Sequence, residues 1–114
     1  MRLSEMQQRN AARANRWHGD MDSWSGLEWA GAMCGEAGEA ANIAKKLRRD
    51  EQQLAGNDET REELLSKLGE ECADVFLYLC LLASRYHIDL ETQIISKFNR
   101  TSDKQGFPER LTIW

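Results

Sequence analysis

The fold is decided by one stretch of the chain, LLSKLGEECADVFLYLCLLA, residues 64–83. Its apolar side chains recur every three or four residues, which is the period of an α-helix. Residues Thr60 to Glu63 have the sequence of a capping box, which predicts the start of this helix, and we expect it to continue to about Tyr86. The apolar stripe of the helix consists of Leu64, Leu68, Cys72, Val75, Leu79 and Leu82.

The rest of the chain also predicts helices. Among 114 residues there are only one valine, five isoleucines and four threonines, and they nowhere alternate with polar residues as a half-buried strand requires. Caps at Ser4, Ser25 and Asp89 predict three further helices, over residues 4–17, 25–49 and 89–101. A polar surface loop is expected over residues 50–58. We therefore expect a single all-α domain, residues 1–114, as a subunit of the four-helix-bundle type.

Two apolar surfaces bear on how these helices pack. The helix expected over residues 25–49 carries a stripe of mostly small side chains, which would let another helix approach closely. This stripe consists of Leu27, Ala30, Cys34, Ala37, Ala41 and Ala44. The next helix is apolar around its whole circumference from Val75 onward, because Leu77, Cys80 and Leu81 project away from its own stripe. One subunit of this size can hardly cover that surface, so we expect a second subunit to cover it.

The composition argues against several classes of protein. Lysine and arginine number 15 against 19 acidic residues, the net charge is −4, and no long basic run offers a surface for nucleic acid. The longest apolar stretch, Val75 to Ala83, has nine residues, whereas a membrane-spanning helix needs ~20. The N-terminus lacks the apolar run of a secretory signal. Three cysteines without CxxC spacing are expected to be reduced thiols in a cytoplasmic protein.

Two pairs of acidic residues lie at i, i+3 spacing in the central helices, Glu36 with Glu39 and Glu71 with Asp74. This spacing places each pair on one face of its helix, where like charges repel, and the surrounding residues are largely apolar. If the two helices pack antiparallel, four carboxylates can meet and would need a cation, for which their hard oxygen ligands favour Mg²⁺, Mn²⁺ or Ca²⁺. The alternative is that these are ordinary surface acids.

A di-iron site is a rival use of carboxylates in a helical bundle. Such a site needs Glu-x-x-His on two helices. His18 and His87 are the only histidines, and neither lies three residues after a glutamate. The sequence therefore argues against di-iron binding.

The acidic pairs belong to longer motifs, GEAGEAANIAKKL at residues 35–47 and LGEECADVFLYL at residues 68–79. Together they resemble the paired signature of the MazG-like all-α nucleoside triphosphate pyrophosphohydrolases. The segment KFNRTSDKQGFP, residues 97–108, is similar to the end of small phage and bacterial members, and Trp24 with Trp29 resembles the approach to their first motif. The resemblance extends from about Trp17 to Leu111.

The resemblance implies a helical bundle assembled as a dimer or a dimer of dimers. It implies hydrolysis of a nucleoside triphosphate between the α and β phosphates, to a monophosphate and pyrophosphate, with Mg²⁺ or its substitute Mn²⁺. It places the metal-binding carboxylates at Glu36, Glu39, Glu71 and Asp74. Either Glu39 or Glu71 is expected to take the proton of the attacking water. The segment between the motifs is longer than in compact members, so the preference for a base stays open.

Five residues outside the acidic pairs are candidates for contact with substrate. The resemblance assigns phosphate or sugar contacts to Lys97 and Asn99, and Lys104 lies close to them in sequence. Trp17 and Trp24 flank a loop just ahead of the acidic helix, so either ring can stack on a base. A tryptophan at such a place is as often an anchor in the core.

Three functions follow from this reading. The first is a housecleaning or phage enzyme of the nucleotide pool. The second is the phosphoribosyl-ATP pyrophosphohydrolase of histidine biosynthesis, which the long central loop and the tryptophans fit less well. The third is a non-catalytic helical dimer that binds a partner through Leu77 and Leu81, although such a module has no reason to keep like-charged pairs in a groove.

Overall fold

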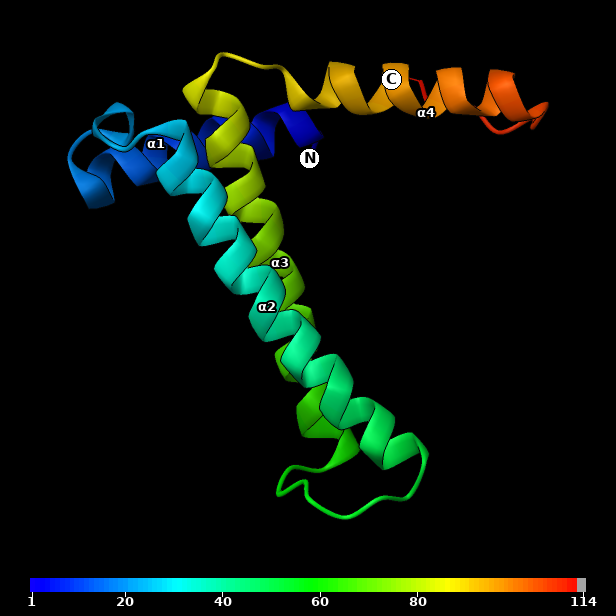
Figure 1. Ribbon diagram of the computed structural model, residues 1–114. Helices are drawn as coiled ribbons and strands as arrows, with labels where there is room; N and C mark the ends of the chain where they lie inside the picture. Colours follow the sequence, from blue (N-terminus) through cyan, green and yellow to red (C-terminus); the bar gives the residue numbers. More distant parts are fainter. Residues whose placement is uncertain (113–114) are drawn as a thin grey trace.

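The computed structural model describes residues 1–112, which form four α-helices and no β-strand within that range (Figure 1). The predicted all-α fold class is confirmed, and each helix lies within a few residues of its expected bounds. The elements are α1 (Leu3–His18), a short 3₁₀ helix η1 (Met21–Ser23), α2 (Gly26–Glu51), α3 (Arg61–Arg85) and α4 (Leu90–Gln105). None of the described helices combines the length and the apolar character needed to cross a bilayer.

Side-chain caps mark the starts of three of the helices. The Ser25 hydroxyl accepts a hydrogen bond from the Glu28 amide, and the Glu28 carboxylate accepts one from the Ser25 amide, so the predicted capping box is confirmed. Thr60 and Asp89 each accept a hydrogen bond from the backbone amide of the third residue after them, but the predicted capping box at Thr60 is only half formed, because Glu63 does not accept a bond from the Thr60 amide. The predicted cap at Ser4 is wrong: α1 begins at Leu3, and Ser4 lies inside its first turn.

Helices α2 and α3 form a long antiparallel hairpin, which Figure 1 shows running from the crossing with α1 to the loop that joins them. Helix α1 lies across the end of the hairpin farthest from this loop and packs on α3. Helix α4 turns away after the end of α3, contacts α1 and projects away from the hairpin. The acidic motifs therefore lie on the hairpin, and residues 97–105 lie on a different arm of the molecule.

Two apolar clusters hold the hairpin together, one at each end. The cluster beside α1 is built around Trp29, whose indole nitrogen donates a hydrogen bond to the Met21 carbonyl over 3.1 Å. The cluster beside the loop is built around Leu64, which is fully buried. The buried members are Ala14, Met21, Trp29 and Leu81 in the first cluster and Ile43, Leu47 and Leu64 in the second.

The face of α3 that we expected a second subunit to cover is largely covered by the chain itself. Cys80 is 0% exposed and Leu81 is 5% exposed in the single chain. Helix α1 packs here, and the amide of its buried Asn10 donates a hydrogen bond of 2.7 Å to the Leu77 carbonyl. The prediction that Cys80 and Leu81 need a partner subunit is therefore wrong, because both are buried within the single chain and α1 packs on Leu81.

The stripe of small residues on α2 does not face α3. Leu27 is 83% exposed, and Cys34, Ala37, Ala41 and Ala44 are also exposed. The residues that α2 turns toward α3 include Trp29, Glu36 and Ile43, each one position before a member of the stripe, which rotates the contact face by about 100°. Trp29 and Ile43 bury more apolar area than alanines do, so the helix packs on the larger side chains.

Candidate metal centre

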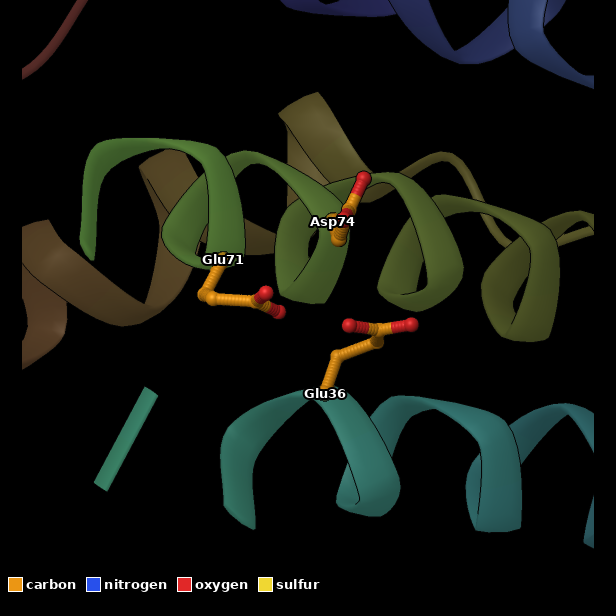
Figure 2. Close-up of side chains that lie close together, drawn as sticks. All are labelled: Glu36, Glu71 and Asp74. Carbon is orange, nitrogen blue, oxygen red and sulfur yellow. The ribbon is translucent and has the colours of Figure 1, made fainter. Parts of the chain in front are cut away.

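Helices α2 and α3 bring Glu36, Glu71 and Asp74 together between the two apolar clusters. One carboxylate oxygen from each residue lies within 4.8 Å of the others, and all three side chains are half-buried. Figure 2 shows Glu36 extending from α2 toward Glu71 on α3, with Asp74 one turn farther along the same helix.

The spacing of the apolar residues explains why these acids face inward. Glu36 lies seven residues after Trp29 and seven before Ile43, so it shares the helix face that packs on α3. Glu71 likewise lies seven residues after Leu64 and seven before Tyr78. The burial of the flanking apolar residues therefore turns both carboxylates into the seam of the hairpin.

The carboxylate of Glu71 has an unusual environment. Its Oε2 atom is buried without a hydrogen-bond partner among the described residues. The pKa of Glu71 is raised to about 7. The neighbouring Glu36 carboxyl is the largest cause, and burial and the Glu39 carboxyl add to it. No ion pair within residues 1–112 involves Glu36, Glu71 or Asp74. A buried oxygen with no donor, facing a second carboxylate, fits a divalent cation, and a set of oxygen ligands suits Mg²⁺.

The fourth predicted acid lies at the edge of this cluster. Glu39 is exposed on the next turn of α2 and contributes to the raised pKa of Glu71, so its carboxyl lies near that residue. Three of the four predicted acids therefore meet at one point, and Glu39 borders them.

A pocket of about 240 Å³ adjoins the cluster, between α1 and the hairpin. Glu36 and Asp74 line it from the hairpin side, and Leu77, Tyr78 and Leu81 of α3 add an apolar surface. The residues of α1 that line it are Asn10, Arg13, Ala14, Trp17 and His18. No local pattern in the sequence distinguishes Asn10 and Arg13, since only the packing of α1 on α3 places them beside the acids.

Comparison with known proteins shows a relative in a bacteriophage. The chain is 34% identical to the Gene 37 protein of Mycobacterium phage L5 over 88 residues, which are 76% of this chain and 73% of that protein. The chain belongs to the family of this phage protein. No family model and no solved structure matches the chain.

Two mammalian relatives carry the name of an enzyme. The chain is 33% identical over 81 residues to dCTP pyrophosphatase 1 of Rattus norvegicus and to that of Mus musculus. The matched part is 71% of this chain and 45% of each rodent protein, so the chain spans less than half the length of these relatives. This distant homology supports the resemblance to MazG-like proteins at the level of the family.

The two predicted tryptophans have different surroundings in the structure. Trp17 lines the pocket, is 74% exposed and stacks on His18 with ring centroids 5.2 Å apart. Trp24 is half-buried and stacks on Trp29 with centroids 4.4 Å apart, as an anchor in the core would. Trp17 is therefore the better placed of the two for stacking on a base.

The predicted substrate residues of α4 are not beside the acids within the chain. Lys97 and Lys104 are exposed on the arm that projects from the hairpin (Figure 1). The side-chain amide of Asn99 donates a hydrogen bond to the backbone carbonyl of Leu111 over 2.9 Å. Its oxygen accepts one from the backbone N–H of Leu111 over 2.8 Å. Asn99 thus holds the segment after α4 against the helix.

Proposed function

We propose that this protein is a metal-dependent nucleoside triphosphate pyrophosphohydrolase. It would cleave a ribo- or deoxyribonucleoside triphosphate between the α and β phosphates and release a monophosphate and pyrophosphate. The observation that carries this proposal is the Glu71 carboxylate, whose Oε2 atom is buried, which faces Glu36 beside Asp74 and which lacks a cationic partner in the described chain. The homology to the rodent dCTP pyrophosphatases supports the substrate class.

Glu36, Glu71 and Asp74 would hold Mg²⁺, with Glu39 at the rim of the site. The bound ion would supply positive charge to phosphate oxygens and activate a water for attack. Glu71 would accept the proton of that water only through an oxygen that does not hold the ion, because a bound cation lowers the pKa of its carboxylate ligands. The exposed Glu39 is the alternative proton acceptor. The aromatic side of the pocket, Trp17 with Tyr78, would take the base by stacking.

We also propose that the protein is a homodimer or a dimer of dimers. Helix α4 leaves Ile94 38% and Phe98 40% exposed on an arm that projects from its own hairpin. A second copy packed against these residues would bury them. Sedimentation of the wild type and of Phe98→Lys tests this, and a wild-type monomer at micromolar concentration would refute it.

The cleavage itself is tested by incubation with each canonical and several modified triphosphates, with and without Mg²⁺. Hydrolysis in ¹⁸O-labelled water should place the label in the nucleoside monophosphate. Label in pyrophosphate, or release of single phosphate with a diphosphate product, contradicts the proposed cleavage. Absence of hydrolysis with every triphosphate favours a non-catalytic role instead.

The biological setting follows from the same chemistry. We propose a role in cleaning the nucleotide pool. A cytoplasmic location agrees with three free thiols, two of them exposed.

A further inference from the structure

Arg13 is an exposed basic residue that lines the same pocket as two of the clustered acids. It belongs to α1, whereas Glu36 and Asp74 line the same pocket from the hairpin. The Arg13 side chain forms no salt bridge with the described residues, and its hydrogen bond goes to Asn10 Oδ1 over 3.2 Å. A guanidinium without a carboxylate partner among the described residues therefore borders a pocket that also contains two acids, Asn10, His18 and several apolar side chains.

The neighbouring Asn10 holds this guanidinium relative to α3. Asn10 is 7% exposed, and its Nδ2 donates a hydrogen bond of 2.7 Å to the Leu77 carbonyl. Its Oδ1 is the atom that accepts from Arg13. A chain of hydrogen bonds thus runs from the backbone of α3 through a buried amide to Arg13. Such support limits the rotamers of a long side chain before any ligand binds.

Two other arginines on α1 provide a comparison. Arg9 and Arg16 are exposed on the same helix, as Arg13 is, but they do not line the pocket that contains Glu36 and Asp74. Helix α1 therefore carries several positive charges on its surface. Of these three arginines, Arg13 alone lines the pocket with the acids.

The chemistry of the pocket indicates what Arg13 binds. Carboxylates repel phosphate oxygens unless a cation lies between them, and a divalent ion held by Glu36 and Asp74 would neutralise only one side of a polyphosphate. The planar guanidinium presents paired N–H donors that match two phosphate oxygens. We propose that Arg13 binds a phosphate group of the substrate from the side opposite the acidic cluster. This inference rests on the proposed function and adds a residue to it.

Binding of inorganic pyrophosphate in the presence of Mg²⁺ tests this role without any need for turnover. Calorimetry should show that Arg13→Gln weakens binding roughly 10- to 100-fold, since a hydrogen-bonded charge is lost. Arg16→Gln removes the same charge from the same helix, and it should weaken binding less than about threefold, because exposed charges at a distance are screened. Arg13→Lys should fall between wild type and Arg13→Gln, because it keeps the charge but loses the paired donors.

Three results overturn the inference. The first is equal weakening by Arg13→Gln and Arg16→Gln. The second is absence of binding of magnesium pyrophosphate by the wild type at millimolar concentration. The third is unchanged pyrophosphate binding by Arg13→Gln with weakened binding of a nucleoside, which would mean that Arg13 contacts the base.

Hydrolysis assays on the same variants separate this inference from the proposed function. If the wild type binds pyrophosphate through Arg13 but hydrolyses no triphosphate, the enzyme assignment fails and the binding site stands. If the wild type hydrolyses triphosphate and Arg13→Gln matches Arg16→Gln in kcat and KM, the enzyme assignment stands and the role of Arg13 fails.

Discussion

Glu59 and Glu71 are carboxylates at two levels of the same hairpin. They differ in whether the described residues place a basic side chain beside the carboxylate. The Glu59 carboxylate accepts a hydrogen bond of 2.9 Å from the Lys46 ammonium, and it lies 3.5 Å from the Lys67 ammonium. The hydrogen bond from Lys46, with help from the charge of Lys67, lowers the pKa of Glu59 to about 2. The carboxyl of Glu36, with burial and Glu39, raises the pKa of Glu71 to about 7. Among the described residues, the carboxylate at the loop end of the hairpin is paired with two lysines, whereas the one in the middle has no basic partner.

The same contrast holds for packing along the seam. Leu64 lies two helical turns before Glu71 and is fully buried in the apolar cluster beside the loop. Glu71 occupies the equivalent position in the middle of the hairpin and places a carboxylate there instead. The apolar clusters on either side hold together helices that the acids push apart. Under the proposed function, stability and catalysis come from different levels of one helix pair.

The largest effect is expected from a change in the middle of the hairpin. Asp74→Asn keeps the size of the side chain but removes a ligand charge, so kcat should fall by roughly a thousandfold or more. Glu70→Gln is the matched control, since Glu70 is exposed on the same helix and should change little. Turnover of Asp74→Asn near that of the wild type at saturating Mg²⁺ would contradict the metal assignment.

The next effect concerns the loop end of the seam. Leu64→Ala should lower the free energy of unfolding by about 2–5 kcal/mol, because it leaves a cavity in a fully buried cluster. Leu65→Ala is the control, since Leu65 is 47% exposed, and it should cost less than about 1 kcal/mol. Urea unfolding measures both. Equal losses in the two variants would mean that this cluster does not hold the hairpin.

A smaller effect is expected from removing the repulsion at Glu71. The folded state binds its proton more tightly than the unfolded state, since the pKa is about 7 instead of 4.5. The contribution of Glu71 to stability without metal is therefore greatest below pH 4.5 and is lost as the pH rises to about 7. Glu71→Gln should melt at a higher temperature than the wild type at pH 8 in a chelator, but not at pH 4.

The response to metal provides the control for this prediction. Mg²⁺ should raise the melting temperature of the wild type at pH 8 by binding the folded state, and should do so much less in Glu71→Gln. A wild type that melts at the same temperature with chelator and with Mg²⁺ would leave the cluster without a role as a metal site.

The smallest effect is expected at Glu59. Its pKa is lowered from 4.5 to about 2, so its stabilising contribution is present above pH 4.5 and is lost as the pH falls toward 2. Glu59→Gln should lower the melting temperature slightly at pH 7, and the difference from the wild type should shrink in acid. A constant difference between pH 7 and pH 3 would show that Lys46 and Lys67 do not act on Glu59 through charge.

The sequence by itself determined the helices and the pairing of the acids. Capping at Ser25 and Thr60 and the apolar period of three and four residues act within a few residues of the chain. The i, i+3 spacing of Glu71 and Asp74 places both on one helix face in any fold that keeps the helix. These features could be predicted because they depend on contacts between near neighbours.

Only the tertiary structure decided which helix faces meet. The two candidate faces of α2 differ by one position in sequence, and the choice depends on how much apolar area Trp29 and Ile43 bury against α3. The covering of Leu81 by α1, the direction of α4 and the position of Arg13 beside the acids follow from the same competition. Residues far apart in sequence together decide which helix faces pack, so no local sequence pattern predicts the packing.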